Sequence, residues 1–324
     1  MDKILIFCGI VVFIFLLILL LSYICFRIVF YAPRKKSAVT EEYPLPVGKI
    51  YEPYHEVMIK WMKDARTLPF EEFTITSFDG LKLYGKYFEY AKGAPIELMF
   101  HGYRGNAERD LCGGIQRCFS IGRNVLLIDQ RTSCNSEGTV ITFGVNECKD
   151  CLSWIDFTIN HFGKDTKIIL TGISMGAATV LMAAGHPLPE NVVGVLADCG
   201  YSSAREIIKK CARQLHLPAN LVYPFIKLGA RLWGHFNLEE FSPIEAMKKC
   251  KVPVIFIHGD TDDFVPCEMS RMNFDACTAP KKFITIAGAG HGLAYPVDAK
   301  KYLQALCDFF TEHGLPTAIV TNEK

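Results

Sequence analysis

The stretch KIILTGISMGAATVLMAAG, from Lys167 to Gly185, constrains the fold of this chain more than any other. Its first part, KIIL, is a short and uninterrupted apolar run, which is typical of a strand buried on both faces of a sheet. Its last part, AATVLMAAG, has the length and the small side chains of a helix that packs closely on such a sheet. Ser174 stands between two glycines where the strand passes into the helix, so it is either a turn residue or a side chain presented on a turn.

Strands and helices alternate along most of the chain. Residues 73–90 predict a hairpin around Asp79-Gly80, because apolar and polar residues alternate on both sides of that turn. Further strands are expected at IELMF, NVLLID, KIILTG, NVVGVLADCG, VPVIFIHGD and KKFITIAG, with helices from about Ala107, from about Asn146, after Ser174 and from Val297 to about His313. Nearly all-apolar strands that alternate with helices predict an α/β fold, with a mostly parallel central sheet and helices on both faces.

The chain is expected to divide into several segments. Residues 1–31 are interpreted as a transmembrane anchor, 32–50 as a juxtamembrane linker, 51–313 as the α/β domain and 314–324 as a mobile tail. Within the domain, residues 202–250 contain helical patterns and no strand candidate. An all-helical insertion between strands of a parallel sheet predicts a small cap.

The N-terminal segment is apolar over its whole length. From Ile4 to Cys25 the chain runs for 22 residues without a charge, and a helix of this length spans roughly 33 Å, enough to cross the hydrocarbon core of a bilayer. A cleaved signal peptide is the alternative, but the run is longer than a signal peptide needs and no cleavage site of the Ala-x-Ala type follows it. We therefore expect an uncleaved, single-pass membrane anchor.

The residues that flank this segment predict its orientation. Lys3 precedes it, whereas Arg27, Arg34, Lys35 and Lys36 follow it. Because the more positive flank tends to remain in the cytoplasm, we expect the C-terminal domain on that side. The 13 cysteines agree, since most lie in apolar or helical stretches, as reduced thiols in a cytoplasmic core do. Large domains behind an N-terminal span are often exported, and this alternative stays open.

The overall charge argues against some partners. The formal net charge is only +1 and no basic run carries interleaved aromatic residues, so nucleic-acid binding is not expected. The single C-x-x-C, Cys148 to Cys151, is not followed by a second pair at the spacing of a zinc site, so no metal site is expected. The oligomeric state is not indicated by any of these features.

Residues Gly172 to Gly176 fit the pattern G-x-S-x-G. A turn of this kind between a strand and a helix is so tight that the serine backbone is strained and its hydroxyl stands clear of the sheet. The glycines let neighbouring elements approach without a Cβ clash. The pattern alone is modest evidence, but its place between a buried strand and a small-residue helix makes Ser174 the candidate nucleophile.

A serine hydroxyl needs a base, and the base needs a carboxylate that orients it. His291 lies in the glycine-rich loop IAGAGHGLAYP, at the same edge of the sheet as Ser174. The loop IFIHGDTDDFVP offers Asp260, Asp262 and Asp263, of which we choose Asp262, because the chain must leave the strand before a carboxylate can face His291. Asp198 is the alternative acid.

An oxyanion needs two backbone N–H donors. Met175, next to Ser174, is expected to supply one. The loop HGYRGN follows the strand IELMF, and its glycines let the backbone bend towards Ser174, so Tyr103 is expected to supply the other.

In this order and on this sheet, Ser174, Asp262 and His291 resemble the α/β-hydrolase superfamily, in its serine-hydrolase branch of bacterial esterase-like and S9/S33 peptidase-like proteins. The resemblance covers residues 71–313. It includes H-G-x-x-G-N, D-Q-R followed by S-E-G, G-x-S-x-G, and H-G-x-x-D-x-x-V-P, which also selects Asp262. One departure is DQRTSCNSEG, where Thr132 and Cys134 stand in place of glycines that relatives often have.

The resemblance implies a serine hydrolase that acts on a small-molecule acyl substrate without a metal or an organic cofactor. A carboxylic ester is the expected substrate, and a peptide with a free N-terminus or a thioester is the alternative. The apolar cap residues could line an acyl pocket or pack on the core: Leu217, Leu221, Val222, Phe225, Ile226, Leu228 and Trp233. A membrane-tethered binding protein without turnover is the competing hypothesis from another class.

Overall fold

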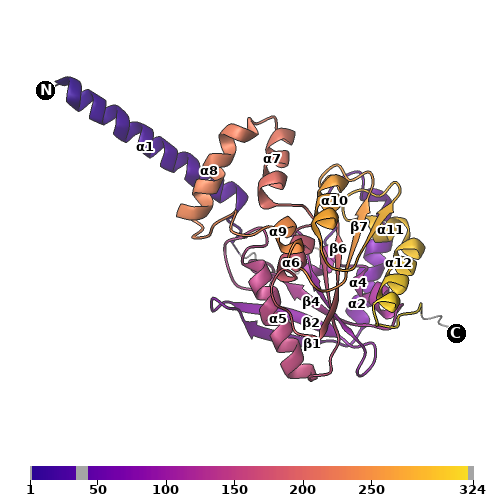
Figure 1. The fold of residues 1–324 in the computed structure, drawn as a ribbon. Helices are drawn as coiled ribbons and strands as arrows, with labels where there is room; N and C mark the ends of the chain where they lie inside the picture. Colours follow the sequence, from indigo (N-terminus) through magenta and orange to yellow (C-terminus); the bar gives the residue numbers. More distant parts are fainter. Residues whose placement is uncertain (1, 34–42, 320–324) are drawn as a thin grey trace.

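The computed structural model describes residues 2–33 and 43–319, and its middle layer is one sheet of eight strands (Figure 1). The strands lie in the order β1-β2-β4-β3-β5-β6-β7-β8. Their bounds are β1 Glu71–Thr76, β2 Lys82–Phe88, β3 Ile96–Phe100, β4 Asn124–Asp129, β5 Ile168–Ile173, β6 Val192–Asp198, β7 Val254–Gly259 and β8 Lys281–Ile286. Among the strands of this described sheet, β1–β2 and β2–β4 pair antiparallel and the other neighbours pair parallel. The expected mostly parallel α/β sheet is confirmed.

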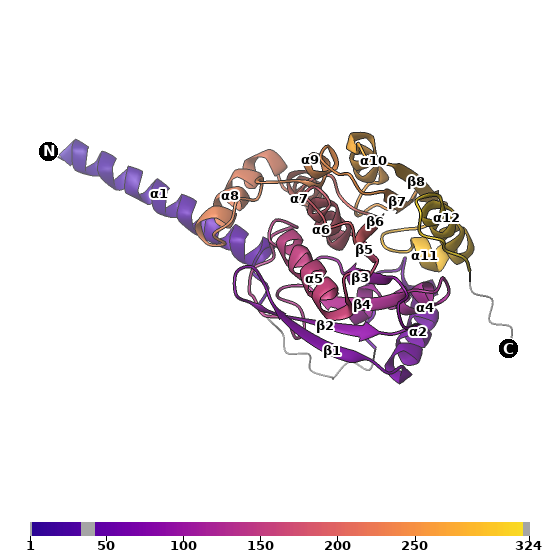
Figure 2. The ribbon, with the colours of Figure 1, turned by 60° about the horizontal axis from the view of Figure 1, so that its bottom comes forward.

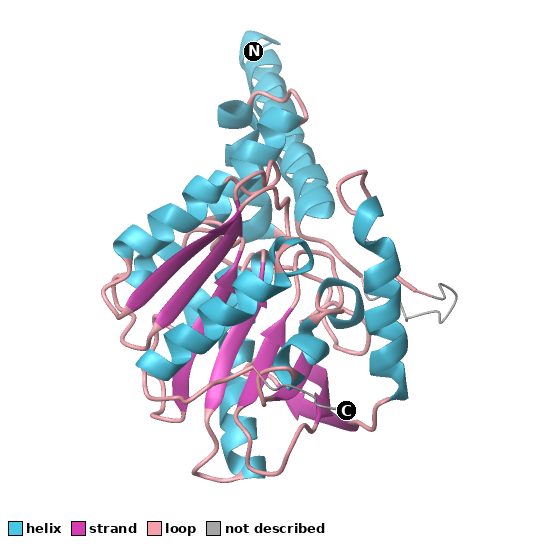
Figure 3. Ribbon diagram, turned by 90° about the vertical axis from the view of Figure 1, so that its right-hand side faces the viewer, coloured by secondary structure: helices cyan, strands magenta, loops and turns pink. Residues whose placement is uncertain are grey.

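Helices cover both faces of the sheet (Figure 3). One face carries α5 (Glu147–Phe162), α6 (Met175–Ala183) and α10 (Cys267–Ala276), and the other carries α4 (Gly114–Phe119) and α12 (Ala299–Glu312), with α2 (His55–Thr67) outside α4. Successive residues of β5 alternate between the two cores, since Leu170 packs with α6 and Ile169 with α12. Because both faces of β5 are buried in this way, its sequence is an apolar run without an exposed polar face.

One expected helix is interrupted. The helix expected from Ala107 consists of α3 (Ala107–Asp110) and α4, and a Cβ on Gly113 between them would lie 2.9 Å from the Trp61 ring. A short 3₁₀ turn, Glu52–Tyr54, precedes α2, and the short helix α11 (Ala294–Val297) precedes α12.

The two cysteines of the C-x-x-C pattern, Cys148 and Cys151, are both buried in α5.

The segment between β6 and β7 is helical, with α7 (Ala204–Gln214), α8 (Ala219–Leu232) and α9 (Pro243–Met247). The short helix α9 rests on α6, whereas α7 and α8 project from the sheet beside the N-terminal helix (Figures 1 and 2).

The N-terminal helix α1 (Asp2–Val29) ends inside the domain rather than above it. Phe30, which follows it, is fully buried between the rings of Phe143 and Phe236. Where α8 crosses α1, a Cβ on Gly229 would lie 2.5 Å from the Ser22 carbonyl oxygen, so only a glycine allows this approach. The last turns of α1 therefore belong to the core.

Along the rest of its length α1 is exposed. Residues Lys3–Val29 are long and apolar enough to cross a membrane, and the most apolar 18 residues among them include no buried one. Membrane anchors and signal sequences share this property. Residues 34–42, which hold Arg34, Lys35 and Lys36 of the predicted linker, lie outside the described residues.

The predicted tail is described only as far as Ile319. Its first residues return to the domain, where the Leu315 N–H donates to the Phe310 carbonyl oxygen at 2.9 Å and Arg123 Nη2 donates to Thr317 Oγ1 at 3.2 Å. This part of the predicted mobile tail is therefore hydrogen-bonded to its surroundings.

Candidate active site

Ser174 occupies the turn between β5 and α6, with φ 56° and ψ −116°. This left-handed backbone is strained for a residue with a side chain. The flanking glycines explain how the turn closes, because a Cβ on Gly172 would lie 2.1 Å from the Gly176 carbonyl oxygen, and one on Gly176 would lie 2.0 Å from the Phe100 carbonyl oxygen. The motif thus has the physical shape that its sequence predicts.

The structure brings Ser174, His291 and Asp262 together from three separate loops. The Ser174 hydroxyl lies 2.9 Å from His291 Nε2, and His291 Nδ1 lies 2.7 Å from Asp262 Oδ2. With the hydroxyl as donor to Nε2 and Nδ1–H as donor to the carboxylate, the three groups form one continuous chain of hydrogen bonds. His291 also packs edge-on against the Phe264 ring.

Asp262 is buried and accepts several hydrogen bonds besides that of His291. The N–H groups of Phe264 and Val265 donate to Oδ1 at 2.9 and 2.8 Å, and His258 Nε2 lies 3.1 Å from Oδ2. Burial by itself would raise the pKa of Asp262, but the hydrogen bonds from His258 and His291 lower the pKa well below its usual range. Asp262 is therefore held ionised.

His258, near the end of β7, is buried beside Asp262. Its Nδ1 lies 2.7 Å from Ser270 Oγ, and that hydroxyl lies 2.9 Å from the Gly200 carbonyl oxygen. Because the hydroxyl proton goes to the carbonyl, Nδ1–H is the donor to Ser270, while Nε2–H is the donor to Asp262 and to the Val265 carbonyl oxygen. Both ring nitrogens of His258 thus have hydrogen-bond partners, which fix the ring next to Asp262.

The other acids have different surroundings. Asp198 is buried and accepts from the Tyr302 hydroxyl at 3.0 Å, and burial raises its pKa to about 6. Asp260 accepts from the Gly288 N–H at 2.7 Å and so fastens the loop that carries His291. The Asp263 side chain is exposed. None of these three carboxylates hydrogen-bonds to His291 among the described residues.

Of the two expected oxyanion donors, Met175 follows Ser174 directly, and Tyr103 lines the same cavity as Ser174. Met175 is the first residue of α6, where N–H groups have no partner within the helix. Among the described residues, the N–H groups of Met175 and Tyr103 donate no hydrogen bond to a protein acceptor. The loop of Tyr103 is held by Asp110, because Oδ2 accepts from the Gly102 N–H at 2.9 Å. Asp110 was not expected from the sequence, since its role depends on a contact across eight residues.

The same loop is attached to α1. The Tyr103 hydroxyl donates to the Val29 carbonyl oxygen at 2.7 Å, and Arg104 Nη2 donates to the carbonyl oxygens of Ile28 and Tyr31 at 2.8 and 3.1 Å. Carbonyls at a helix C-terminus lack intrahelical partners and favour a cation, so Arg104 stabilises the end of α1.

The departure at DQRTSCNSEG keeps the backbone of a glycine-rich loop. Thr132 has φ 74° and Cys134 has φ 43°, both in the left-handed region. Ser133 between them donates to the Gly105 carbonyl oxygen at 2.9 Å and so supports the loop of Tyr103. Thr132 and Cys134 therefore adopt a backbone conformation that favours glycine, at the cost of strain.

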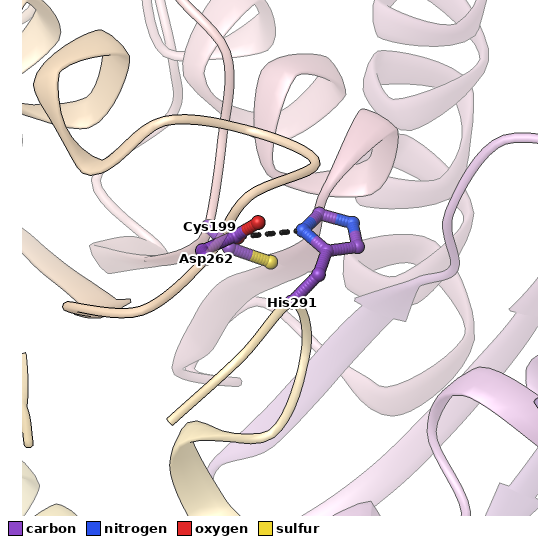
Figure 4. Close-up of side chains that lie close together, drawn as sticks. All are labelled: Cys199, Asp262 and His291. Carbon is purple, nitrogen blue, oxygen red and sulfur yellow. Dashed lines mark hydrogen bonds and ion pairs between the residues drawn. The ribbon is translucent and has the colours of Figure 1, made fainter. Parts of the chain in front are cut away.

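Cys199 lies beside His291 and Asp262, as Figure 4 shows. One potential ligand atom from each of the three residues lies within 4.8 Å of the others. Such a set of sulfur, nitrogen and oxygen could bind Zn²⁺. A metal here would have to replace the hydrogen bond between His291 Nδ1 and Asp262, and burial raises the pKa of Cys199 well above its usual range, which disfavours the thiolate that a metal needs.

Ser174 and His291 open into a cavity of about 220 Å³. Its apolar lining includes Met58, Trp61, Met99 and Tyr295. The cap residues considered for an acyl pocket are not among the described residues that line it, so α2, α4 and α11 shape this space instead.

Sequence comparisons place the chain among hydrolases. The prolyl oligopeptidase family, peptidase S9, matches residues 141–315. The uncharacterized protein YqkD of Bacillus subtilis is 26% identical over 190 residues, which is 58% of this chain but less than two thirds, 62%, of YqkD. The protein bem46 of Schizosaccharomyces pombe is 26% identical over 234 residues, 71% of each chain.

Solved structures share the fold. The Pyrococcus furiosus esterase Pf2001 has a TM-score of 0.63 and 18% identity, over 84% of this chain and 97% of its own. A puromycin-hydrolyzing peptidase of Mycobacterium tuberculosis has a TM-score of 0.59 and 16% identity, over 76% of this chain and 39% of its own. An α/β hydrolase of Penicillium, GrgF, has a TM-score of 0.60 and 18% identity, over 76% of this chain and 99% of its own. With this fold, and with a family match over more than half of its length, the chain belongs to the prolyl oligopeptidase family of α/β hydrolases.

Proposed function

We propose that this protein is a serine hydrolase that cleaves carboxylic esters through an acyl-enzyme intermediate. Ser174 is the nucleophile, His291 the general base, and Asp262 the carboxylate that orients His291. The observation that carries the proposal is the unbroken chain of hydrogen bonds from Asp262 to the Ser174 hydroxyl, with distances of 2.7 and 2.9 Å. It ends on a hydroxyl that the strained turn presents at the N-terminus of α6.

The reaction follows from the direction of these hydrogen bonds. Ser174 Oγ attacks the substrate carbonyl carbon as its proton moves to His291 Nε2, and the N–H groups of Tyr103 and Met175 stabilise the oxyanion. The tetrahedral intermediate collapses, and His291 returns the proton to the leaving alcohol. Water, deprotonated by His291, then attacks the acyl-enzyme, and His291 returns that proton to Ser174 Oγ as the acid is released. Asp262 stays ionised and stabilises the imidazolium form of His291.

The size and lining of the cavity support a small acyl substrate. About 220 Å³ accommodates a short acyl or alkyl group, and its methionine and aromatic lining favours an apolar one. A peptidase is the second candidate, because the family match and the likeness to a puromycin-hydrolyzing peptidase favour it. A thioesterase would use the same groups.

The test is covalent labelling combined with turnover. The wild type should react with a fluorophosphonate, whereas Ser174→Ala should not react and should lose a factor of about 10⁴ to 10⁶ in kcat. Ser153→Ala, in α5, is the matched control and should behave as the wild type. A Ser174→Ala variant with a tenth of the wild-type activity would exclude this mechanism, and an unlabelled wild type would favour a non-catalytic binding protein.

A substrate panel separates the candidate activities. Acyl esters of two to twelve carbons should be cleaved faster than aminoacyl amides, with the highest kcat/KM for the short chains. Faster cleavage of amides that have a free N-terminus would assign the protein as an aminopeptidase.

We also propose that α1 is a membrane anchor and that the catalytic domain lies on the cytoplasmic side. The exposed apolar surface of α1 supports the anchor. The excess of basic residues after the span supports the orientation. In intact cells, a cell-impermeant maleimide should leave the cysteines of the domain unlabelled, and efficient labelling would reverse the orientation.

A further inference from the structure

Helix α8 carries a row of apolar side chains that belong to none of the hydrophobic core clusters of the described chain. Leu221, Phe225, Leu228 and Leu232 recur at spacings of three and four residues and so share one face of the helix. Leu221 is 65% exposed and Leu232 is 39% exposed, and Phe225 and Leu228 are half-buried. The turn before α8 adds Leu215 and Leu217, with exposed fractions of 70% and 45%. We call these six residues the leucine face.

The other faces of α8 have defined partners. Tyr223, Ile226 and Ala230 are buried in the main core. Gly229 touches α1, and Trp233 just after α8 donates from Nε1 to Ser22 Oγ at 3.2 Å. At 100° per residue, the leucine face lies between two other sides of α8. One is the side that contacts α1, and the other is the polar side with Asn220, Lys227 and Arg231. It therefore looks out beside α1.

The exposed length of α1 locates the bilayer relative to α8. From Lys3 to Leu21 the helix contains no buried residue, and from Ser22 onwards buried residues begin. These 19 residues span roughly 28 Å, close to the thickness of the hydrocarbon core. The boundary of the bilayer then falls at Ser22, where α8 lies across α1 (Figures 1 and 2).

Aromatic and charged residues at this level have the distribution of an interface. The rings of Tyr23 and Trp233 meet edge-on at 5.2 Å, and both are partly exposed, as tyrosine and tryptophan often are at the edge of a membrane. Residues 204–233 contain six basic residues and one acidic residue, Glu206, which leaves a net charge of +5. Exposed Arg231 lies next to the leucine face, where phosphate headgroups would surround it, whereas Lys227 is paired with Glu239.

We propose that the leucine face is a second membrane contact, in which α8 lies in the interface and inserts its apolar side chains among anionic phospholipids. The proposal depends on α1 as the membrane span but not on hydrolysis. It explains why apolar cap residues are exposed although they line no part of the cavity of Ser174. It also places the cap, and the loop of Tyr103 that is bonded to α1, directly at the lipid surface.

The test uses Trp233 as the reporter of contact with lipid. The full chain is reconstituted into vesicles of phosphatidylcholine and phosphatidylserine in which the phosphatidylcholine is brominated at carbons 6 and 7, and tryptophan fluorescence is measured. Trp154 is buried in the core and Trp61 lies in α2. The difference in quenching between the wild type and Trp233→Phe therefore isolates Trp233. We expect a quenched component in the wild type that Trp233→Phe lacks.

Two neighbouring substitutions test the leucine face itself. Leu221→Glu places a charge in it, whereas Asn220→Glu places the same charge on the polar side of the same turn. Both positions are exposed, so both variants should keep the wild-type circular dichroism. We expect Leu221→Glu to reduce the quenching of Trp233 at least twofold and Asn220→Glu to leave it unchanged.

Equal effects of the two substitutions, or equal quenching in the wild type and Trp233→Phe, would overturn the proposal. Flotation with the vesicles reports on α1 separately, and a chain that does not float would remove the span and this contact together. Fluorophosphonate labelling in the same vesicles tests Ser174 separately. If Ser174 is not labelled, the hydrolase assignment fails, but the quenching of Trp233 still tests the membrane contact of α8.

Discussion

Two buried aspartates lie near His291, and their surroundings shift their pKa values in opposite directions. Asp262 accepts hydrogen bonds from two histidines and two backbone N–H groups, which stabilise its charge. Asp198 accepts from the Tyr302 hydroxyl, and its other oxygen, Oδ1, has no partner among the described residues. Only an ionised carboxylate can stabilise an imidazolium, so the pKa values favour Asp262 as the acid of the proposed triad.

Substitution of each acid by its amide tests this assignment. Asp262→Asn should lower kcat by about 10³ to 10⁴, because the amide favours the wrong tautomer of His291. Asp198→Asn should lower kcat by less than about tenfold, because Asn can still accept from Tyr302. Steady-state kinetics on a soluble ester measures both, and a large loss confined to Asp198→Asn would move the acid to β6.

The pKa of Asp198 also predicts a pH dependence of stability. The unfolded aspartate loses its proton near its ordinary pKa of about 4, whereas the folded one keeps it up to about 6. Between these values the folded state binds more protons, so this group's contribution to stability is present below about pH 4 and is lost as the pH rises to about 6. Urea unfolding across this range should show a smaller fall for Asp198→Asn than for the wild type. The free energy of unfolding of Asp198→Asn should still fall somewhat across this pH range, since burial also raises the pKa of Asp150 to about 6. Parallel profiles for the two proteins would contradict the shift.

At the scale of elements, the loop between β4 and α5 maintains its shape under strain. Thr132 is β-branched and has φ 74°, a conformation that favours glycine. Its N–H nevertheless donates to the Glu137 carbonyl oxygen at 2.9 Å, which closes the loop. The loop in turn supports Gly105 through Ser133, so the strain serves the position of the Tyr103 backbone.

Relief of this strain should stabilise the protein. Thr132→Gly should raise the free energy of unfolding by about 1 kcal/mol, because the left-handed penalty is removed at some cost in chain entropy. Thr139→Gly, an exposed position of the same loop without a positive φ, is the control and should lower it. Denaturant midpoints measure both, and stabilisation by neither or by both would contradict this account.

The sequence predicts those elements whose signals are local. The strands, the turn at Ser174 and the two loops that carry Asp262 and His291 follow from apolar runs and glycine spacing, so the order of the site along the sheet edge was predictable. The bonds from Asp110 to Gly102 and from His258 through Ser270 to Gly200 were not, because they depend on which loops meet. The break at Gly113 likewise depends on the approach of Trp61, which the helical pattern of its own segment does not reveal.

At the scale of the whole molecule, α1 has two parts with different roles. Its first part is exposed along its length, whereas Ser22, Phe26 and the following Phe30 are buried in contact with the domain. Loss of the second part would expose the rings of Phe143 and Phe236. It would also remove the Ile28 carbonyl oxygen to which Arg104 donates. The segment expected from composition to be only an anchor therefore also completes the core, which the sequence could not reveal because its apolar run continues without a break.

Two shortened chains separate these roles. A chain that begins at Ser22 should keep the thermal midpoint and the soluble-ester turnover of the full chain in detergent, because it retains the buried turns. A chain that begins at Pro33 should unfold at a lower temperature and lose turnover, since burial of large aromatic side chains contributes several kcal/mol and the Tyr103 loop loses its attachment. Equal stability and turnover of the two shortened chains would show that α1 is dispensable to the domain.

The hydrogen bonds from Tyr103 and Arg104 to the end of α1 have a kinetic consequence. A hydrolase on a long flexible tether samples a volume of solution, and its rate follows the bulk concentration of substrate. Here the loop beside the proposed nucleophile is bonded to the helix itself, so with α1 in a bilayer the site stays at one height above the membrane. For a substrate dissolved in the same membrane, the frequency of encounters is then set by the number of substrate molecules per unit area.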